Sequence, residues 1–182
     1  MKFKSEDIQI LFSSEQIQTR IKSLASEINE YYDNEEIIVI CVLKGAVVFA
    51  IDLMKHLNMP LKMEFIRLAS YHGTTETTGK VKTVDISLPN LTNKNVLIIE
   101  DIIDKGYTAR FLMDFINCNF KTKSTKFCSL LDKKIARIID IESDFYGFEV
   151  EDQFVVGYGL DYDEYYRNLD YIGFISKDLL NS

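Results

Sequence analysis

Short, β-branched apolar runs alternate with segments of helical character, and this alternation limits the fold more than any other feature of the sequence. Residues 36–43 (EIIVICVL), 61–69 (LKMEFIRLA), 95–101 (NVLIIED), 124–132 (STKFCSLLD) and 154–161 (FVVGYGLD) are expected to form strands. Residues 46–57 and 108–118 are expected to form helices between them. Such alternation predicts an α/β fold with a mostly parallel sheet. Right-handed crossovers would then place the functional loops at the carboxyl ends of the strands.

The sequence before the first of these strands predicts one more helix, over residues 13–32. An apolar stripe of helical period runs along it, formed by Ile17, Ile21, Leu24, Ala25 and Ile28. Ser13 followed by Gln16 has the spacing of a capping box, in which each side chain bonds the other residue's backbone N–H. The helix is therefore expected to begin directly after Ser13.

Length and composition predict a single domain over residues 1–182. The formal net charge of −7 argues against a nucleic-acid partner, which usually requires a basic patch. No apolar stretch approaches the roughly 18 residues of a membrane span, and the first residues lack a signal-peptide core, so no membrane partner is expected. Cys41, Cys118 and Cys128 lie in apolar runs without metal-site spacing, so we expect buried free thiols in a cytoplasmic protein.

The segment VLIIEDIIDKGYTARFL, residues 96–112, contains the densest chemistry of the chain. Glu100 and Asp101 end an expected strand, and Gly106 permits a tight loop before a helix whose first turn includes the Thr108 hydroxyl. A strand, a glycine turn and a helix N-terminus together form a cradle for phosphate. The Walker A spacing is absent.

The acidic side chains of this loop require a partner other than phosphate, which they would repel. Sugar hydroxyls donate hydrogen bonds to carboxylates, and Mg²⁺ commonly binds one or two carboxylates together with substrate phosphates. The pattern therefore indicates a phosphorylated sugar with Mg²⁺. A solvated acidic loop with a helix cap remains an alternative at this point.

The segment VLIIEDIIDKGYT resembles the phosphoribosyl-diphosphate loop of type I phosphoribosyltransferases, in the form typical of the hypoxanthine-guanine enzymes. Four other segments, CVLKGAVVFAIDL, EFIRLASYHGTTETTGKVK, SLLDK and FVVGYGLDYDEYYRNLDYIG, resemble further motifs of this family in the family's order. The match extends over residues 8–175. It implies a type I phosphoribosyltransferase fold, a mostly parallel twisted sheet flanked by helices with a small hood.

The resemblance also implies a reaction in purine salvage. Hypoxanthine, and with it guanine, would react with phosphoribosyl diphosphate to give IMP or GMP and pyrophosphate, with Mg²⁺ as cofactor. Asp104 would be the catalytic acid and base beside the purine. Glu100 and Asp101 would hold the ribose hydroxyls, directly or around a metal. The 5-phosphate would be bound by a loop of five residues: Asp104, Lys105, Gly106, Tyr107 and Thr108.

The family motifs imply the remaining sites as well. Pyrophosphate would meet Lys44, Gly45 and Arg167, and the peptide bond before Lys44 would be cis. The purine would be held by Lys133 at its 6-oxo group, by the ring of Phe154, by the backbone of Val155 and by Asp161. The metal ligands would be Glu100, Asp101 and Asp161. Ser70 and Tyr71 would lie in a mobile loop that closes over the site.

Lys105 departs from the family pattern, which usually has a threonine or serine at this position. Three alternatives therefore remain beside the main prediction: an enzyme for xanthine or another base, a binding protein disabled by Lys105, and an RNA-binding regulator with the same fold. The acidic composition argues against the last of these. The family usually forms homodimers or homotetramers, on which the sequence is silent.

Overall fold

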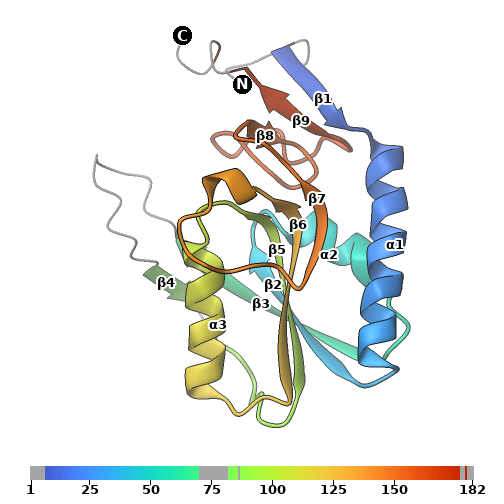
Figure 1. The fold of residues 1–182 in the computed structure, drawn as a ribbon, viewed down its shortest axis with the longest axis vertical. Coiled ribbons are helices and arrows are strands. Elements are labelled where there is room, and N and C mark those ends of the chain that lie inside the picture. Colours follow the sequence, from blue (N-terminus) through green and yellow to red (C-terminus); the bar gives the residue numbers. More distant parts are fainter. Residues whose placement is uncertain (1–6, 70–81, 86, 177–178, 180–182) are drawn as a thin grey trace.

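The computed structural model describes residues 7–69, 82–85, 87–176 and 179. Two sheets and three α-helices form this part of the chain (Figure 1). In chain order the elements are β1 (Ile8–Phe12), α1 (Ser14–Tyr32), β2 (Ile37–Leu43), α2 (Val47–Met54), β3 (Leu61–Ala69), β4 (Lys82–Asp85), β5 (Asn95–Ile103), α3 (Tyr107–Asn119), β6 (Ser124–Asp132), the 3₁₀ turn η2 (Lys134–Ala136), β7 (Phe145–Glu149), β8 (Phe154–Val156) and β9 (Ile172–Ile175).

The larger sheet has the strand order β4-β3-β2-β5-β6-β7. All its pairs are parallel except β3 with β4, so the predicted α/β fold with a mostly parallel sheet is confirmed. The register puts Ile38 of β2 beside Val96 of β5, and Val96 beside Thr125 of β6. Strands β2 and β5 are buried along most of their length, because helices cover both faces of the sheet.

Alternate residues of β2 and β5 supply two separate cores, as the period of a strand requires. On one face, α1 and α2 pack against a cluster that includes Val39, Leu97 and Phe49. On the other, α3 packs against a cluster that includes Ile40 and Ile98. The sheet therefore forms the middle of three layers, with β2 and β5 at its centre (Figure 1).

Helix α1 begins where the sequence predicts. The Ser13 hydroxyl accepts a hydrogen bond from the Gln16 backbone N–H, and the Gln16 side chain accepts one from the Ser13 N–H, which confirms the capping box. The predicted stripe is confirmed too, since all five of its residues are buried.

The smaller sheet has the order β1-β9-β8 with antiparallel pairs, and we call it the hood. It lies beyond one end of the large sheet (Figure 1). The prediction of a main-sheet strand over residues 154–161 is wrong: β8 ends at Val156, and Gly157 and Gly159 take positive φ. An apolar run of this length does not reveal which sheet it joins.

Two further differences concern short elements and one cysteine. Strands β1, β4, β7 and β9 lack a strong apolar pattern and were not predicted from the sequence. Cys118 is exposed rather than buried, because α3 turns its Ala109, Leu112 and Ile116 face to the sheet and Cys118 lies away from that face. Cys41 and Cys128 are buried free thiols as expected. None of the helices in the described ranges has the length and apolarity to cross a membrane.

Candidate active site

The chain leaves β2 and β5 toward opposite faces of the sheet, since α2 follows β2 on one face and α3 follows β5 on the other. Such a topological switch point is where open α/β sheets bind their ligands. Gly45, directly after β2, lies so close to the Asp101 carboxyl group that a Cβ on this glycine would overlap with it. The two loops that the sequence marks as functional therefore meet at the carboxyl end of the central strands.

Glu100 and Asp101 bring carboxyl groups into this poorly hydrated place. Glu100 is buried, with its Oε2 lacking a hydrogen-bond partner among the described residues. Burial, and secondly the charge of Asp101, raises the pKa of Glu100 well above its ordinary value. Burial likewise raises the pKa of Asp101 to about 6, although the Ile102 backbone N–H donates a 2.9 Å hydrogen bond to Asp101 Oδ1. A cation or a hydroxyl donor at this point would stabilise both carboxylates.

The loop from Asp104 to Thr108 has the form of an anion cradle. Gly106 has φ +90° and is the N-cap of α3, without a side-chain cap. Thr108 is the second residue of the helix, so its hydroxyl lies in the first turn as predicted. The first N–H groups of a helix have no intrahelical acceptor, and this first turn contains no acidic residue that would compete with an anion.

Arg137 holds this cradle from behind, a role that the sequence did not reveal. Its Nε donates to the Asp104 carbonyl at 2.9 Å, and its two other nitrogens donate to the carbonyls of Ile103 and Ile141 and to the Asp132 carboxylate. A Cβ on Gly106 would press on the Arg137 side chain. The guanidinium thus fixes the path of the loop through backbone carbonyls, which leave no motif in the sequence.

The Lys105 side chain is exposed, whereas its backbone is fixed. The Lys105 carbonyl accepts hydrogen bonds from the N–H groups of Ile138, at 3.1 Å, and Ile139, at 3.0 Å. The segment after η2 therefore anchors the cradle at a second point. The ammonium group remains available to an anion or to solvent.

The turn after β8 packs onto the loop after β2. A Cβ on Gly159 would overlap with the Gly45 carbonyl, so these two backbones are in direct contact. The neighbouring Tyr158 is buried, and its hydroxyl donates to Asp52 of α2 at 2.5 Å, while Gln18 of α1 donates to the same carboxylate oxygen at 3.0 Å. Helices α1 and α2 therefore position the hood turn against the sheet.

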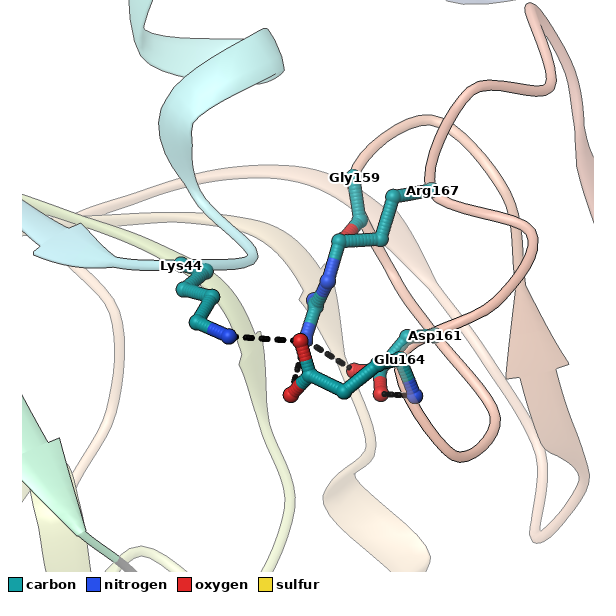
Figure 2. A network of polar contacts seen from close by, with 5 residues as sticks. All are labelled: Lys44, Gly159, Asp161, Glu164 and Arg167. Carbon is teal, nitrogen blue, oxygen red and sulfur yellow. Dashed lines mark hydrogen bonds and ion pairs between the residues drawn. The ribbon is translucent and has the colours of Figure 1, made fainter.

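Lys44 and Arg167, predicted from distant segments, lie in one polar network (Figure 2). The Leu43–Lys44 peptide bond is cis, as the resemblance implied. Arg167 donates from Nη1 to the Gly159 carbonyl at 2.8 Å and pairs through Nη2 with Asp161, also at 2.8 Å. Its Nε is buried and has no partner among the described residues. Glu164, which the sequence did not single out, joins Lys44 to Arg167.

The end of β6 and the start of β8 form the other side of the site. Lys133 is buried, and its Nζ donates to the Gln153 carbonyl at 2.9 Å and lies 3.9 Å from Asp152. Phe154 is 40% exposed and meets the ring of Tyr162 edge to face, with 5.4 Å between ring centroids. An exposed aromatic ring beside a buried ammonium group suits a flat, polar-edged ligand.

The structure brings most of the predicted residues to one end of the large sheet, but it does not place all of them together. Within the described ranges, no three acidic, histidine or cysteine side chains gather as a metal cluster. Asp161, predicted as a metal ligand, bonds Arg167 and the Glu164 N–H instead. Ser70 and Tyr71 lie outside the described residues.

Fold and site together define a class: an open, mostly parallel α/β sheet with a hood, and an acidic strand end and anion cradle at its switch point. The family model of the phosphoribosyl transferase domain matches residues 9–163, and the chain belongs to this family. The fold class is therefore that of the type I phosphoribosyltransferases, as predicted.

Named relatives agree with this assignment. The chain is 44% identical over 174 residues to a hypoxanthine-guanine phosphoribosyltransferase of Bacillus subtilis, with 96% of each chain covered. It is 40% identical to an enzyme of the same name from Streptococcus thermophilus, with 95% of this chain and 96% of the relative covered. A hypoxanthine-guanine phosphoribosyltransferase structure from Bacillus anthracis matches with TM-score 0.87 and 46% identity, covering 92% of this chain and 98% of that one.

Replacement of Arg137 is expected to destabilise the protein. Arg137→Ala leaves the buried Asp132 carboxylate unpaired and three backbone carbonyls without their donor. We expect the free energy of unfolding to fall by about 3 kcal/mol in urea titrations. Arg110→Ala is the control, because Arg110 is an exposed arginine whose guanidinium also bonds a backbone carbonyl. An equal, small effect of both variants would contradict the anchoring role of Arg137.

The buried Asp101 predicts an unusual pH dependence. An unfolded aspartate loses its proton near pH 4, but folded Asp101 keeps it to about pH 6. The folded state binds more protons between these values, so the contribution of Asp101 to stability falls as pH rises from 4 to 6. Asp101→Asn should therefore be more stable than the parent at pH 7, by about 2 kcal/mol, and not at pH 4. Thermal melts across this range, with Asp163→Asn as an exposed control, measure the difference; a less stable variant at pH 7 would contradict it.

Proposed function

We infer that this chain transfers the 5-phosphoribosyl group of phosphoribosyl diphosphate to hypoxanthine and guanine, giving IMP or GMP and pyrophosphate in purine salvage. Family membership and the named relatives support this activity. One observation carries it: the acidic end of β5 leads directly into the anion cradle of α3, and the loop with Lys44 lies against it. Ribose hydroxyls, 5-phosphate and pyrophosphate would each find a group of matching charge.

The reaction places three demands on the chain. The anomeric carbon becomes oxocarbenium-like as pyrophosphate leaves, so the leaving anion must be stabilised and the reactants held in line. We propose that Lys44 and Arg167 bind the pyrophosphate and that the loop from Asp104 to Thr108 binds the 5-phosphate. Asp104, exposed at the start of that loop, then exchanges a proton with the imidazole part of the purine.

Base selection would depend on Lys133. An ammonium group has three N–H donors, and Gln153 and Asp152 can accept two of them, which leaves one for the purine 6-oxo group. Adenine presents a donor at this position and would leave the buried ammonium without its third partner. Phe154 would stack on the ring, and the Val155 backbone and Asp161 would lie near the purine 2-position.

Mg²⁺ is part of this proposal. Glu100 offers a buried carboxylate oxygen without a partner, and Asp101 lies next to it, so the residues fit a hard cation. Since no third acidic side chain joins them in the described ranges, the ribose hydroxyls and phosphates of the substrate would complete the ligand set. The cation would neutralise negative charge on the pyrophosphate as it leaves. In this arrangement Glu100 and Asp101 bind the ribose directly or through the metal.

We further propose that residues 1–182 act as one domain, in the cytoplasm, as a homodimer or homotetramer. The family match over residues 9–163 supports the first point. Buried free thiols at Cys41 and Cys128 suit the reducing cytoplasm. Exposed apolar side chains such as Phe65 of β3 and Ile51 of α2 offer surface for a second copy.

A spectrophotometric assay tests the activity directly. The protein is incubated with phosphoribosyl diphosphate, Mg²⁺ and, in turn, hypoxanthine, guanine, xanthine and adenine. Turnover with hypoxanthine and guanine is expected, and none with adenine. Turnover with xanthine alone would establish the xanthine enzyme instead. No turnover at all, together with a salt-sensitive shift of RNA in a gel, would favour the RNA-binding regulator.

Asp104→Asn separates proton transfer from binding. The amide keeps the shape of the side chain but cannot take up a proton, so kcat should fall by about 100-fold or more. The Kd for IMP should change little, because the backbone of the loop is unaltered. Asp114→Asn on α3 is the control for loss of one exposed charge. Near-normal kcat in Asp104→Asn would exclude this residue as the acid and base.

Lys133→Ala tests base selection. Loss of the donor to the 6-oxo group should lower kcat/KM for hypoxanthine and reduce the ratio of hypoxanthine to adenine activity by about tenfold or more. Lys134→Ala is the matched control, since its exposed ammonium group pairs with Glu149. An unchanged ratio in Lys133→Ala would remove Lys133 from the base pocket.

Lys105→Thr restores the residue that the family usually has in the cradle. If the exposed Lys105 ammonium contacts the 5-phosphate, the KM for phosphoribosyl diphosphate should rise in the variant, by about threefold for a solvent-exposed charge. The same assay should show little change in the KM for hypoxanthine. An unchanged KM for phosphoribosyl diphosphate would mean that the backbone N–H groups bind the phosphate without help from Lys105.

A further inference from the structure

Glu164 places one carboxylate between two cations from different parts of the chain (Figure 2). Its Oε2 lies 2.5 Å from Lys44 Nζ, on the loop after β2, and its Oε1 lies 3.3 Å from Arg167 Nη2, in the hood segment. These pairs lower the pKa of Glu164, with the Lys44 contact as the larger cause. Lys44 and Arg167 are the two cations assigned to pyrophosphate, so Glu164 lies where an anionic oxygen of that group would bind.

The backbone around Glu164 is fixed, although its side chain is exposed. Tyr162 and Tyr165 exchange backbone hydrogen bonds of 3.2 and 3.0 Å, and Asp161 Oδ2 accepts one from the Glu164 N–H at 2.8 Å. Asp163 and Glu164 take positive φ within this tight turn. The side chain of Glu164 is 63% exposed, so it can rotate away without any change in the turn.

We propose that Glu164 is an internal competitor of pyrophosphate, bound to Lys44 and Arg167 in the empty enzyme and displaced by the pyrophosphate group of the substrate. This inference depends on the pyrophosphate site of the proposed function. Glu164 thereby weakens the binding of pyrophosphate and speeds its release as product.

The energies agree with an exchangeable contact. Exposed ion pairs contribute about 0–1 kcal/mol each, so the two pairs of Glu164 hold the cations only weakly. A pyrophosphate group carries several negative charges and offers more acceptors than one carboxylate. The buried Arg167 Nε, which has no partner among the described residues, supplies a donor that Glu164 leaves unused. After displacement the Glu164 carboxylate stays tethered near the bound anion and repels it.

Calorimetric titration of the full-length protein with Mg²⁺-pyrophosphate tests the proposal. Glu164→Gln keeps the length of the side chain and removes its charge, and it should lower the Kd for pyrophosphate by about three- to tenfold at low ionic strength. High salt should shrink this difference. Asp163→Asn is the matched control, because it removes one exposed negative charge from the neighbouring position of the same turn, and it should leave the Kd within about twofold.

Each outcome decides. A lower Kd in Glu164→Gln alone supports the competitor role. An unchanged or higher Kd in Glu164→Gln overturns it, and so does an equal decrease in both variants, which would reflect only the general charge of the turn. If the parent protein binds no pyrophosphate, the proposed function fails and this inference with it, whereas pyrophosphate binding with no effect of Glu164→Gln refutes this inference alone.

Discussion

The contact between Gly45 and the Asp101 carboxyl group is the constraint on which the site depends. A side chain at position 45 would overlap with that carboxyl group, and a side chain at position 159 would overlap with the Gly45 carbonyl. The loop after β2 is therefore held between the end of β5 and the hood turn. Because these approaches involve backbone, the loop with Lys44 has little freedom relative to the acidic strand end. Ribose and pyrophosphate sites can then keep a fixed separation.

Holding the carboxylates there has a cost that a ligand can relieve. Glu100 and Asp101 lie where burial disfavours their charged forms, and Glu100 Oε2 and Arg167 Nε lack partners in the described part of the chain. Unsatisfied buried groups of opposite charge on neighbouring loops indicate a site arranged for something that binds. Stability is lower without the ligand, and the same groups are ready when it arrives.

Residues that contact no substrate in our proposal still determine what the site can do. Arg137 fixes the cradle through the carbonyls of Ile103, Asp104 and Ile141, so that the N–H groups at the start of α3 remain free to face an anion. Tyr158 fixes the hood turn by donating to Asp52. Glu164 neutralises Lys44 and Arg167 in the empty site, which keeps two cations from facing each other without a counter-ion.

The sequence by itself determined the main sheet, its three long helices and the residues of the acidic loop, because period, caps and motif spacing are local properties that the chain carries without folding. The tertiary structure alone decided that residues 154–156 join the hood, that Cys118 faces away from the core, and that Arg137 and Glu164 take part in the site. These outcomes depend on contacts between residues far apart in sequence or on backbone carbonyls, for which a side-chain pattern holds no information. The physical reason is that a strand's partner and a charge's counter-ion are chosen by packing, which acts only after the elements have formed.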